Sequence, residues 1–467
     1  MVRLLDLVMA LASLRPHIRP TLLLAYPVML SQLGHVLVNV VDSMVVGHTG
    51  TVPLAAVSLG VSVTTLLMVL GLGLSMGITP LVAAADGQRD ITRLGQLLTG
   101  GVIMSTLAGV ALAGLGWLIT PLLKYLNQPP AVVALAAPWV RVMFLSLIPL
   151  MVFQGFRQFA EGLGLTRQAM ILSVLANVIN AVLCYAFVYG RLGAPNLGMM
   201  GAAWATLIAR VIMAALMAAY VLRAKRLRPY HEAIVSWRPE WHIQRRLLDI
   251  GLPIGAHLVF EVGAFSVSAI MAGWLGASTQ AAHQIAINVA SVTFMAVSGV
   301  ATAATIRVGN LRGIGDMAGA RRAGFTAYWL TFLFMATCGL LLVVARHYIP
   351  LFYNSDPAVV AQAASLLLIA ALFQISDGLQ VVGLGALRGL EDVKVPSLVA
   401  LLSYWVVALP LSYVLGFWLD WGAQGVWVGL LVGLSSVAAI LLRRFARETQ
   451  GTAVAGSALN ESAVLVR

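Results

Sequence analysis

Long apolar runs, separated by short polar or charged stretches, follow one another along the whole chain. Each run holds about 20 residues or more, which is enough for a helix to cross about 30 Å of hydrocarbon. The pattern therefore predicts about twelve membrane-spanning helices. The expected spans are residues 24–46, 53–83, 94–120, 133–158, 168–190, 198–222, 246–272, 280–308, 323–346, 358–384, 394–418 and 424–443.

The composition agrees with this pattern. Hydrophobic residues make up 60% of the chain and charged residues 10%, and the mean hydropathy is +0.93. Soluble domains carry about 25% charged residues, so the chain lies well outside soluble usage. We expect an all-α polytopic membrane protein.

The basic balance raises the alternative of a nucleic-acid-binding protein, because the net charge is +12. If the N-terminus is cytoplasmic, however, nearly all Lys and Arg residues of the loops lie on the cytoplasmic side of the membrane. Only Lys124, Arg191 and Arg346 then lie in loops on the opposite side. This asymmetry follows the positive-inside rule. We therefore expect an inner-membrane protein with both termini in the cytoplasm and no nucleic-acid partner. Cys184 and Cys338 both lie in expected spans, so the sequence implies no disulfide framework.

The two halves of the chain are similar to each other. When Pro27 is aligned with Pro253, "PVMLSQLGHVLVNVVDSMVVGHTG" meets "PIGAHLVFEVGAFSVSAIMAGWLG" without a gap. Later, "EGLGLTRQAM" meets "RGLEDVKVPS" and "GMMGAAWATLIA" meets "GAQGVWVGLLVG". Six spans per half is an even number, so the two lobes form a parallel internal repeat.

The repeat and the polar stretches predict four regions. They are an N-terminal lobe with spans 1–6 (residues 1–222), a cytoplasmic linker (223–245), a C-terminal lobe with spans 7–12 (246–445) and a flexible C-terminal tail (446–467).

Three carboxylates lie deep within expected spans: Asp42, Glu261 and Asp377. An ionised carboxylate costs about 3 kcal/mol on insertion scales, so such residues mark ion or proton pathways by default. The alternative is a protonated group that serves helix contacts alone.

The neighbouring polar residues differ between the lobes. His257 precedes Glu261 by one helical turn, whereas His35 stands at the position that matches Glu261 in the first lobe. For His35, His257 and His283, a structural role in helix packing is the alternative to a functional one. Arg141 and Arg210 also fall in spans, where Arg141 is expected to extend toward the interface and Arg210 to pair with a carboxylate.

At these residues the chain resembles the multidrug and toxic compound extrusion (MATE) family, and its NorM-like bacterial branch most closely. The resemblance covers nearly the whole chain. It rests on five stretches in this order: "VVDSMVVGHTG", "EGLGLTRQAM", "FEVGAFSVSAIMAG", "AAHQIAINVASVTFM" and "FQISDGLQVVGLGALRG". It implies export of organic cations and amphipathic drugs, driven by sodium or proton flow through alternating access between the lobes.

The resemblance also implies two sites. In the second lobe, Glu261 and Asp377 look like the cation site of the sodium-coupled branch. Gln284 and Asn288 lie in the neighbouring motif and offer neutral oxygens, which suit hard cations.

In the first lobe, Asp42, Asn180 and Thr206 match the other known site type. Cys184 departs from the family pattern, which usually has Asp or Asn there, and a thiol is a poor sodium ligand. Asp42 is therefore expected to carry a proton or to contact the substrate, and Asn180, Thr206, His35 and His257 are assigned to the same role.

These observations predict a secondary active multidrug antiporter with no cofactor besides its coupling ion, sodium or proton. Its expected partners are membrane lipids and cationic or amphipathic substrates, and we expect a monomer. The nearest alternative is a lipid-linked saccharide flippase, which should hold several basic residues in its spans. A channel is less expected because the two internal copies are unequal.

An enzyme is not expected. His257 and Glu261 lack the second His of a zinc-protease helix, and "GLGLSMG" lies within a span, where its glycines suit helix contacts rather than a nucleotide loop.

Overall fold

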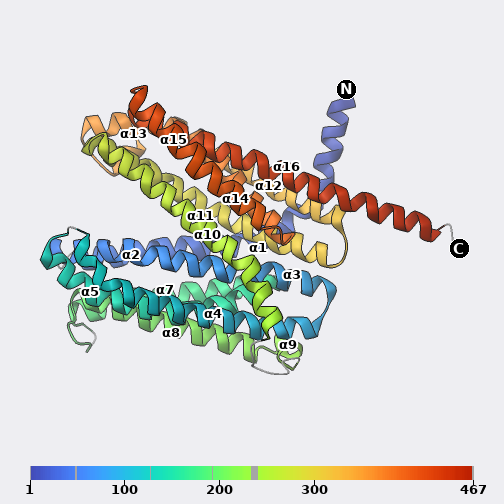
Figure 1. Cartoon of the computed structure of the whole chain (residues 1–467), viewed down its shortest axis with the longest axis horizontal. Helices are drawn as coiled ribbons and strands as arrows, with labels where there is room; N and C mark the ends of the chain where they lie inside the picture. The colour runs from blue at the N-terminus through green and yellow to red at the C-terminus, as the bar shows by residue number, and fades with distance from the viewer. Residues whose placement is uncertain (1, 48–49, 127, 192, 233–239, 465–467) are drawn as a thin grey trace. The chain divides into compact units, whose positions relative to one another are not determined.

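The computed structural model describes residues 2–47, 50–126, 128–191, 193–232 and 240–464, without the side chains of 2–13, 35–43, 47, 226, 231–232 and 451–464. Every regular element in these ranges is helical (Figure 1). The first half holds α1 (Val2–Gly47), α2 (Thr51–Met76), α3 (Ile78–Gln88), α4 (Ile91–Ile119), η1 (Thr120–Tyr125), α5 (Pro130–Leu145), α6 (Leu147–Gly162), α7 (Thr166–Tyr189), α8 (Met199–Arg223), η2 (Lys225–Leu227) and α9 (Arg228–Glu232).

The second half begins with the long helix α10 (Trp241–Trp274). It continues with α11 (Ala277–Gly313), α12 (Met317–Ala345), η3 (Ile349–Phe352), α13 (Pro357–Gly389), α14 (Lys394–Leu402), η4 (Ser403–Ala408), α15 (Leu409–Tyr413), η5 (Val414–Trp418) and α16 (Gly422–Val464). Of the short elements, η4 and η5 are π-helical turns, and η1 and η3 are 3₁₀ turns.

Eleven helical segments of the described residues are long and apolar enough to cross a membrane, the first at Thr51–Gln88 and the last at Gly422–Gln450. The first expected span lies in α1. The predicted class, an all-α polytopic protein with two repeated lobes, is therefore confirmed. α16 continues to Val464, into the stretch for which the sequence predicts a flexible tail, and it contains no proline that would end it earlier.

The chain forms two compact units. Unit 1 comprises Met1–Met29 and Phe260–Arg467, and unit 2 comprises Leu30–Val259. The N-terminal part of α1 belongs to unit 1 because Arg307 donates hydrogen bonds to the carbonyl of His17 (2.5 Å) and to Oγ1 of Thr21 (3.0 Å). The predicted linker at 223–245 remains a prediction from the sequence.

Matching residues of the repeat make matching contacts within their own units. Asp90 accepts a hydrogen bond from the backbone N–H of Arg93 (2.9 Å) and starts α4, and Asp316 accepts one from Gly319 (2.7 Å) and starts α12. A carboxylate at this position satisfies a helix N–H that has no partner within the helix. The repeat therefore extends to the caps that begin its helices.

A second matched pair lies where a buried threonine meets a carbonyl. In unit 2 the hydroxyl of Thr79 shares its one hydrogen between the backbone carbonyl of Gln158 (3.2 Å) and the side-chain oxygen of the same residue. In unit 1 Thr305 donates a hydrogen bond to the carbonyl of Gly385 (2.8 Å). These bonds join α3 to α6 and α11 to α13. The two halves thus share a detail of helix contact that hydrophobic pattern alone does not specify.

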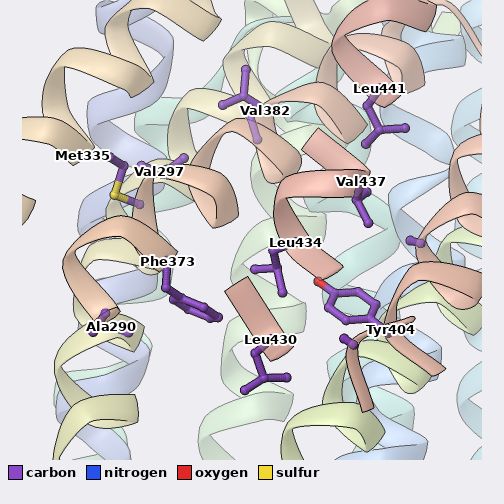
Figure 2. Packing of buried hydrophobic residues seen from close by; sticks show 14 of the residues in the cluster. Ala290, Val297, Met335, Phe373, Val382, Tyr404, Leu430, Leu434, Val437 and Leu441 are labelled. Atoms are coloured by element: carbon purple, nitrogen blue, oxygen red, sulfur yellow. The ribbon is translucent and has the colours of Figure 1, made fainter. Parts of the chain in front are cut away.

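The core of unit 1 is built by α11, α13, α16 and the π-helical turn η4 (Figure 2). Phe373, Tyr404, Leu430 and Leu434 are at most 1% exposed. A Cβ at Gly385 would collide with the carbonyl of Ala301, so this glycine lets α13 approach α11 closely. Small residues serve the same purpose between helices in membranes generally.

Unit 2 uses its glycine run in the same way. Cβ atoms at Gly73 and Gly77 of "GLGLSMG" would collide with the backbone of Gly255 and Gly251 in α10. The prediction that this run serves helix contact is confirmed.

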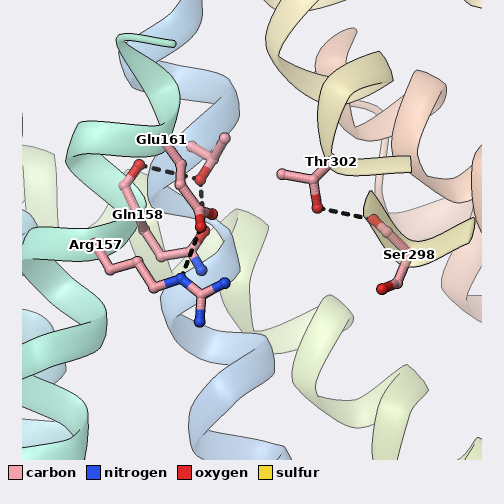
Figure 3. Close-up of polar contacts among 6 residues, drawn as sticks. Arg157, Gln158, Glu161, Ser298 and Thr302 are labelled. Carbon is pink, nitrogen blue, oxygen red and sulfur yellow. Dashed lines mark hydrogen bonds and ion pairs between the residues drawn. The ribbon is translucent and has the colours of Figure 1, made fainter. Parts of the chain in front are cut away.

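Unit 2 also buries an ion pair within one helix. Nε of Arg157 lies 2.7 Å from Oε1 of Glu161, one turn further along α6, and both side chains are at most 7% exposed (Figure 3). Gln158, between them, accepts a hydrogen bond from Thr79 through its side-chain oxygen (2.5 Å). Mutual pairing lowers the cost of burying the two charges.

Candidate ion-coupling site

The two buried carboxylates of unit 1 lie on different helices, Glu261 on α10 and Asp377 on α13. They are 6% and 5% exposed, and the charge on Glu261 acts on Asp377. The structure thus brings together the pair that the sequence predicts as a cation site. Two like charges in a low-dielectric interior repel each other, so the pair favours a bound cation or a shared proton.

Glu261 is held by hydrogen bonds from two further helical segments. The hydroxyl of Tyr404 donates to Oε1 of Glu261 (3.0 Å), and Nε2 of Gln380 lies 3.3 Å from the same oxygen. Tyr404 and Gln380 are both fully buried. Gln380 lies one turn beyond Asp377 on α13, and Tyr404 lies in the π-helical turn η4.

The carboxylate of Asp377 has fewer hydrogen bonds from the described residues than that of Glu261. Its Oδ1 is buried and accepts no hydrogen bond from the described residues. A buried polar atom without a partner requires an explanation, such as an ion or a water molecule. One turn before it, the fully buried Gln374 accepts a hydrogen bond from Thr293 (3.1 Å) and donates one to the carbonyl of Met335 (3.3 Å).

The site therefore brings together the carboxylates of Glu261 and Asp377, with Gln380 and Tyr404 as hydrogen-bond donors to Glu261. Carboxylate oxygens are ligands that hard cations prefer. Arg388, further along α13, is a basic group whose charge acts on Glu261. The donor set fits a small hard cation or a proton.

A series of aromatic rings in contact extends from Tyr404. Phe265 meets Tyr404 edge to face with ring centroids 6.2 Å apart, and it meets Phe373 at the same distance. Phe373 in turn lies 5.2 Å from Trp427, whose indole N–H donates to Nδ1 of His283 (3.1 Å). His283 thus has a defined hydrogen-bond partner within unit 1.

The other predicted second-lobe ligands lie apart from the carboxylates. Gln284 donates a hydrogen bond to Asn288 (3.0 Å), and both side chains are exposed on α11. Within the described residues, no hydrogen bond joins either of them to Glu261 or Asp377. Their contribution as cation ligands stays a prediction.

In unit 2, Nδ2 of Asn180 donates a hydrogen bond to Oγ1 of Thr206 (3.2 Å), so the structure joins α7 to α8 through these two predicted residues. Oδ1 of Asn180 is buried without a partner in the described residues, and Cys184 is buried one turn further along. His257 is buried on α10. The side chains of His35 and Asp42 lie outside the described part of the chain.

Arg141 and Arg210, which the sequence places in spans, have different surroundings. Arg210 donates a hydrogen bond to the hydroxyl of Ser146 (2.6 Å) within unit 2. The guanidinium of Arg141 lies over the ring of Trp117, 5.9 Å from its centroid, and its side chain is exposed.

Tyr404 and Gln380 were not predicted from the sequence. A weak signal for Gln380 exists in "SDGLQ", because a residue three positions after Asp377 lies on the same helix face. Nothing local marks Tyr404, because its partners come from two other helices.

The fold and this site define a multi-pass membrane protein with two repeated helical lobes and a carboxylate pair buried in one of them. The profile of the MatE family matches residues 27–186 and 253–414, one block in each half. The chain belongs to the MATE family.

Relatives and solved structures agree. The chain is 36% identical to the probable multidrug resistance protein NorM of Mesorhizobium japonicum, over 93% of this chain and 94% of that one. It is 39% identical to the probable NorM of Rhodopseudomonas palustris, over 95% and 94%. A crystal structure of the eukaryotic MATE transporter AtDTX14 matches with a TM-score of 0.82 at 21% identity, over 94% of this chain and 99% of that one. An outward-facing MATE transporter matches with a TM-score of 0.85 at 22% identity, over 93% and 96%.

Proposed function

We propose that the protein is a secondary active multidrug antiporter that exports organic cations and amphipathic drugs in exchange for sodium ions or protons. The observation that carries the proposal is the pair Glu261 and Asp377, buried on two helices, with a buried oxygen of Asp377 that has no hydrogen-bond partner in the described residues. Carboxylates in this setting mark ion and proton pathways. The names of the NorM relatives, which refer to multidrug resistance, support the choice of substrate.

The coupling follows from the charge of the site. A cation or proton that neutralises the carboxylates shifts the conformational equilibrium only if its affinity differs between the two access states. We infer that the protein is a monomer in the inner membrane, with cytoplasmic termini and no cofactor besides the coupling ion. The first-lobe residues Asp42, Asn180 and Thr206 form a second proposed site, for a proton or for the substrate.

The test is efflux of a fluorescent organic cation, ethidium, from proteoliposomes that hold the purified protein. Sodium and proton gradients are imposed separately, and collapse of each by an ionophore is the control. Efflux that follows one of the two gradients supports the proposal, and the gradient that drives it names the coupling ion. Ethidium retention under both gradients, with binding of a lipid-linked pyrophosphate instead, would replace the antiporter by the flippase alternative.

A further inference from the structure

Two neighbouring residues of η4 hold α10 at the carboxylate Glu261. Tyr404 donates to the Glu261 side chain (3.0 Å), and the indole N–H of Trp405 donates to the carbonyl of Phe260 (3.1 Å). Gly263 leaves the room that Trp405 occupies, since a Cβ there would lie 3.2 Å from its ring. Residues 404 and 405 therefore form a clasp on α10.

The clasp depends on a non-standard helical turn. Ser403–Ala408 is π-helical, whereas the matching helix of the first half, α7, is α-helical over its whole length and has Asn177 at the position of Tyr404. π-helical turns are rare and are frequently found at functional sites. The clasp is thus built into one lobe only.

The hydroxyl of Tyr404 lies within hydrogen-bond distance of two acceptor oxygens but has only one hydrogen to donate. It lies 3.0 Å from Oε1 of Glu261 and 3.0 Å from Oε1 of Gln380, and Nε2 of Gln380 lies 2.6 Å away. A phenol has one hydrogen, so it donates to one of the two oxygens at a time. The choice depends on which oxygen carries more negative charge, and an ionised carboxylate is the stronger acceptor.

We propose that Tyr404 is a positioning residue whose hydrogen bond depends on the charge of Glu261 and thereby couples that charge to the conformation of the π-helical turn η4. When Glu261 is ionised, Tyr404 donates to it, accepts from Nε2 of Gln380 and closes the clasp. When a cation or proton neutralises Glu261, the hydroxyl hydrogen turns toward Oε1 of Gln380 and the clasp loosens. This inference rests on the proposed ion coupling, which it deepens.

The consequence is a two-state element whose balance the coupling ion sets. The closed state has a charge-assisted bond that the open state lacks, so neutralising Glu261 shifts the population toward the open state. Asp377 and Arg388 are charged groups that also act on this site, and both lie on α13. Tyr404 connects η4 to the charge of Glu261 through its hydrogen bond.

The test is hydrogen exchange, followed by mass spectrometry, of peptides that cover residues 403–413 in the purified full chain. Tyr404→Phe removes the hydroxyl alone. Tyr413→Phe is the matched control, because Tyr413 lies in the same span, is 40% exposed and stacks on Phe417. The coupling cation identified by the efflux assay is added at saturation, and binding is followed separately through its effect on the melting temperature.

In the wild type and in Tyr413→Phe, saturating cation should speed exchange in this segment at least threefold. In Tyr404→Phe the cation should still raise the melting temperature, with a half-maximal concentration within about threefold of wild type, but exchange should no longer respond. Efflux should fall at least tenfold, a loss of turnover with binding retained. Glu261→Gln should exchange fast without any cation, because the neutral amide imitates the neutralised carboxyl group.

Three results would overturn the inference. They are a normal cation response of exchange in Tyr404→Phe, wild-type efflux in that variant, or slow exchange in Glu261→Gln. If Tyr404→Phe does not fold, Gln380→Met, which removes the second acceptor, must give the same loss of exchange response. Failure of the proposed function is distinguishable, because the wild type itself would then show no effect of either ion on melting or efflux.

Discussion

The indole N–H of Trp427 donates a hydrogen bond of 3.1 Å to Nδ1 of His283, and both rings are at most 1% exposed. An indole N–H only donates, so His283 is neutral and carries its hydrogen on Nε2. The pair connects α11 to α16 in unit 1.

His283→Leu should lower the free energy of unfolding by about 1–3 kcal/mol, because it leaves the buried N–H of Trp427 without an acceptor. The measurement is thermal or denaturant unfolding in detergent, followed by tryptophan fluorescence. His242→Leu is the control, since the His242 side chain is 70% exposed and its loss should change stability by less than about 0.5 kcal/mol. Equal stability of both variants would show that the bond contributes nothing.

Glu261→Gln and Asp377→Asn should each abolish cation-stimulated efflux while the protein stays folded. Each amide keeps the shape of the side chain and removes its charge. A cation at 100 times its Kd stabilises the wild type by about 2.7 kcal/mol, and this gain should disappear in both variants. Asp42→Asn is the comparison, in which efflux should fall while cation stabilisation remains. Cation stabilisation that survives in both second-lobe variants would move the ion site elsewhere.

Gly162 and Gly389 occupy matching places at the ends of α6 and α13, and both should resist substitution. A Cβ at Gly162 would lie 2.6 Å from Cβ of Val82, and one at Gly389 would lie 2.8 Å from the carbonyl oxygen of Thr305. Substitution of either glycine by Ala should destabilise the protein by about 1–3 kcal/mol. Gly114→Ala is the control, because nothing lies within 4 Å of a Cβ there. The unfolding midpoint of that variant should not fall.

His17 should make stability depend on pH. Burial, the Arg307 guanidinium and Arg322 lower the pKa of His17 below its usual 6.5, whereas Asp316 raises it. Between the lowered pKa and 6.5 the unfolded chain binds more protons than the folded chain, so stability falls as the pH drops through this window. The loss should be a fraction of the ~1.4 kcal/mol per pH unit that one proton gives, because the ring is partly exposed.

Unfolding of the wild type and of His17→Gln between pH 7.5 and pH 5.5 checks this expectation. The variant should lose less stability than the wild type over that interval. His242→Gln, which changes an exposed imidazole, should follow the wild type. A steeper loss in His17→Gln than in the wild type would reverse the sign and contradict the prediction.

Most of the fold could be predicted because a membrane imposes one requirement, a helix of sufficient apolar length. The expected span at 133–158 falls within α5 and α6, and the span at 394–418 coincides with α14–η5. What the pattern missed is how these spans are divided. The break at Ser146 and the π turn at Ser403 depend on backbone hydrogen bonding, to which a count of apolar residues is insensitive.

The candidate site was predicted only in part, for a related reason. Glu261 and Asp377 stand out because a carboxylate in an apolar span is costly and therefore rare. Tyr404 and Gln380 carry no such cost and resemble ordinary span residues. Their role follows from the meeting of α10, α13 and η4, which sequence spacing does not specify.

The buried pair of Arg157 and Glu161 has a consequence for the biogenesis of the protein. Because both residues lie one turn apart on α6, their ion pair forms as soon as that helix does and needs no other helix. The segment can therefore leave the translocation machinery with its two charges already neutralised, whereas Glu261 and its hydrogen-bond partners meet only after the chain has been synthesised as far as Tyr404. The ion pair of α6 therefore precedes the second half of the chain, and the proposed coupling site is among the last features to form.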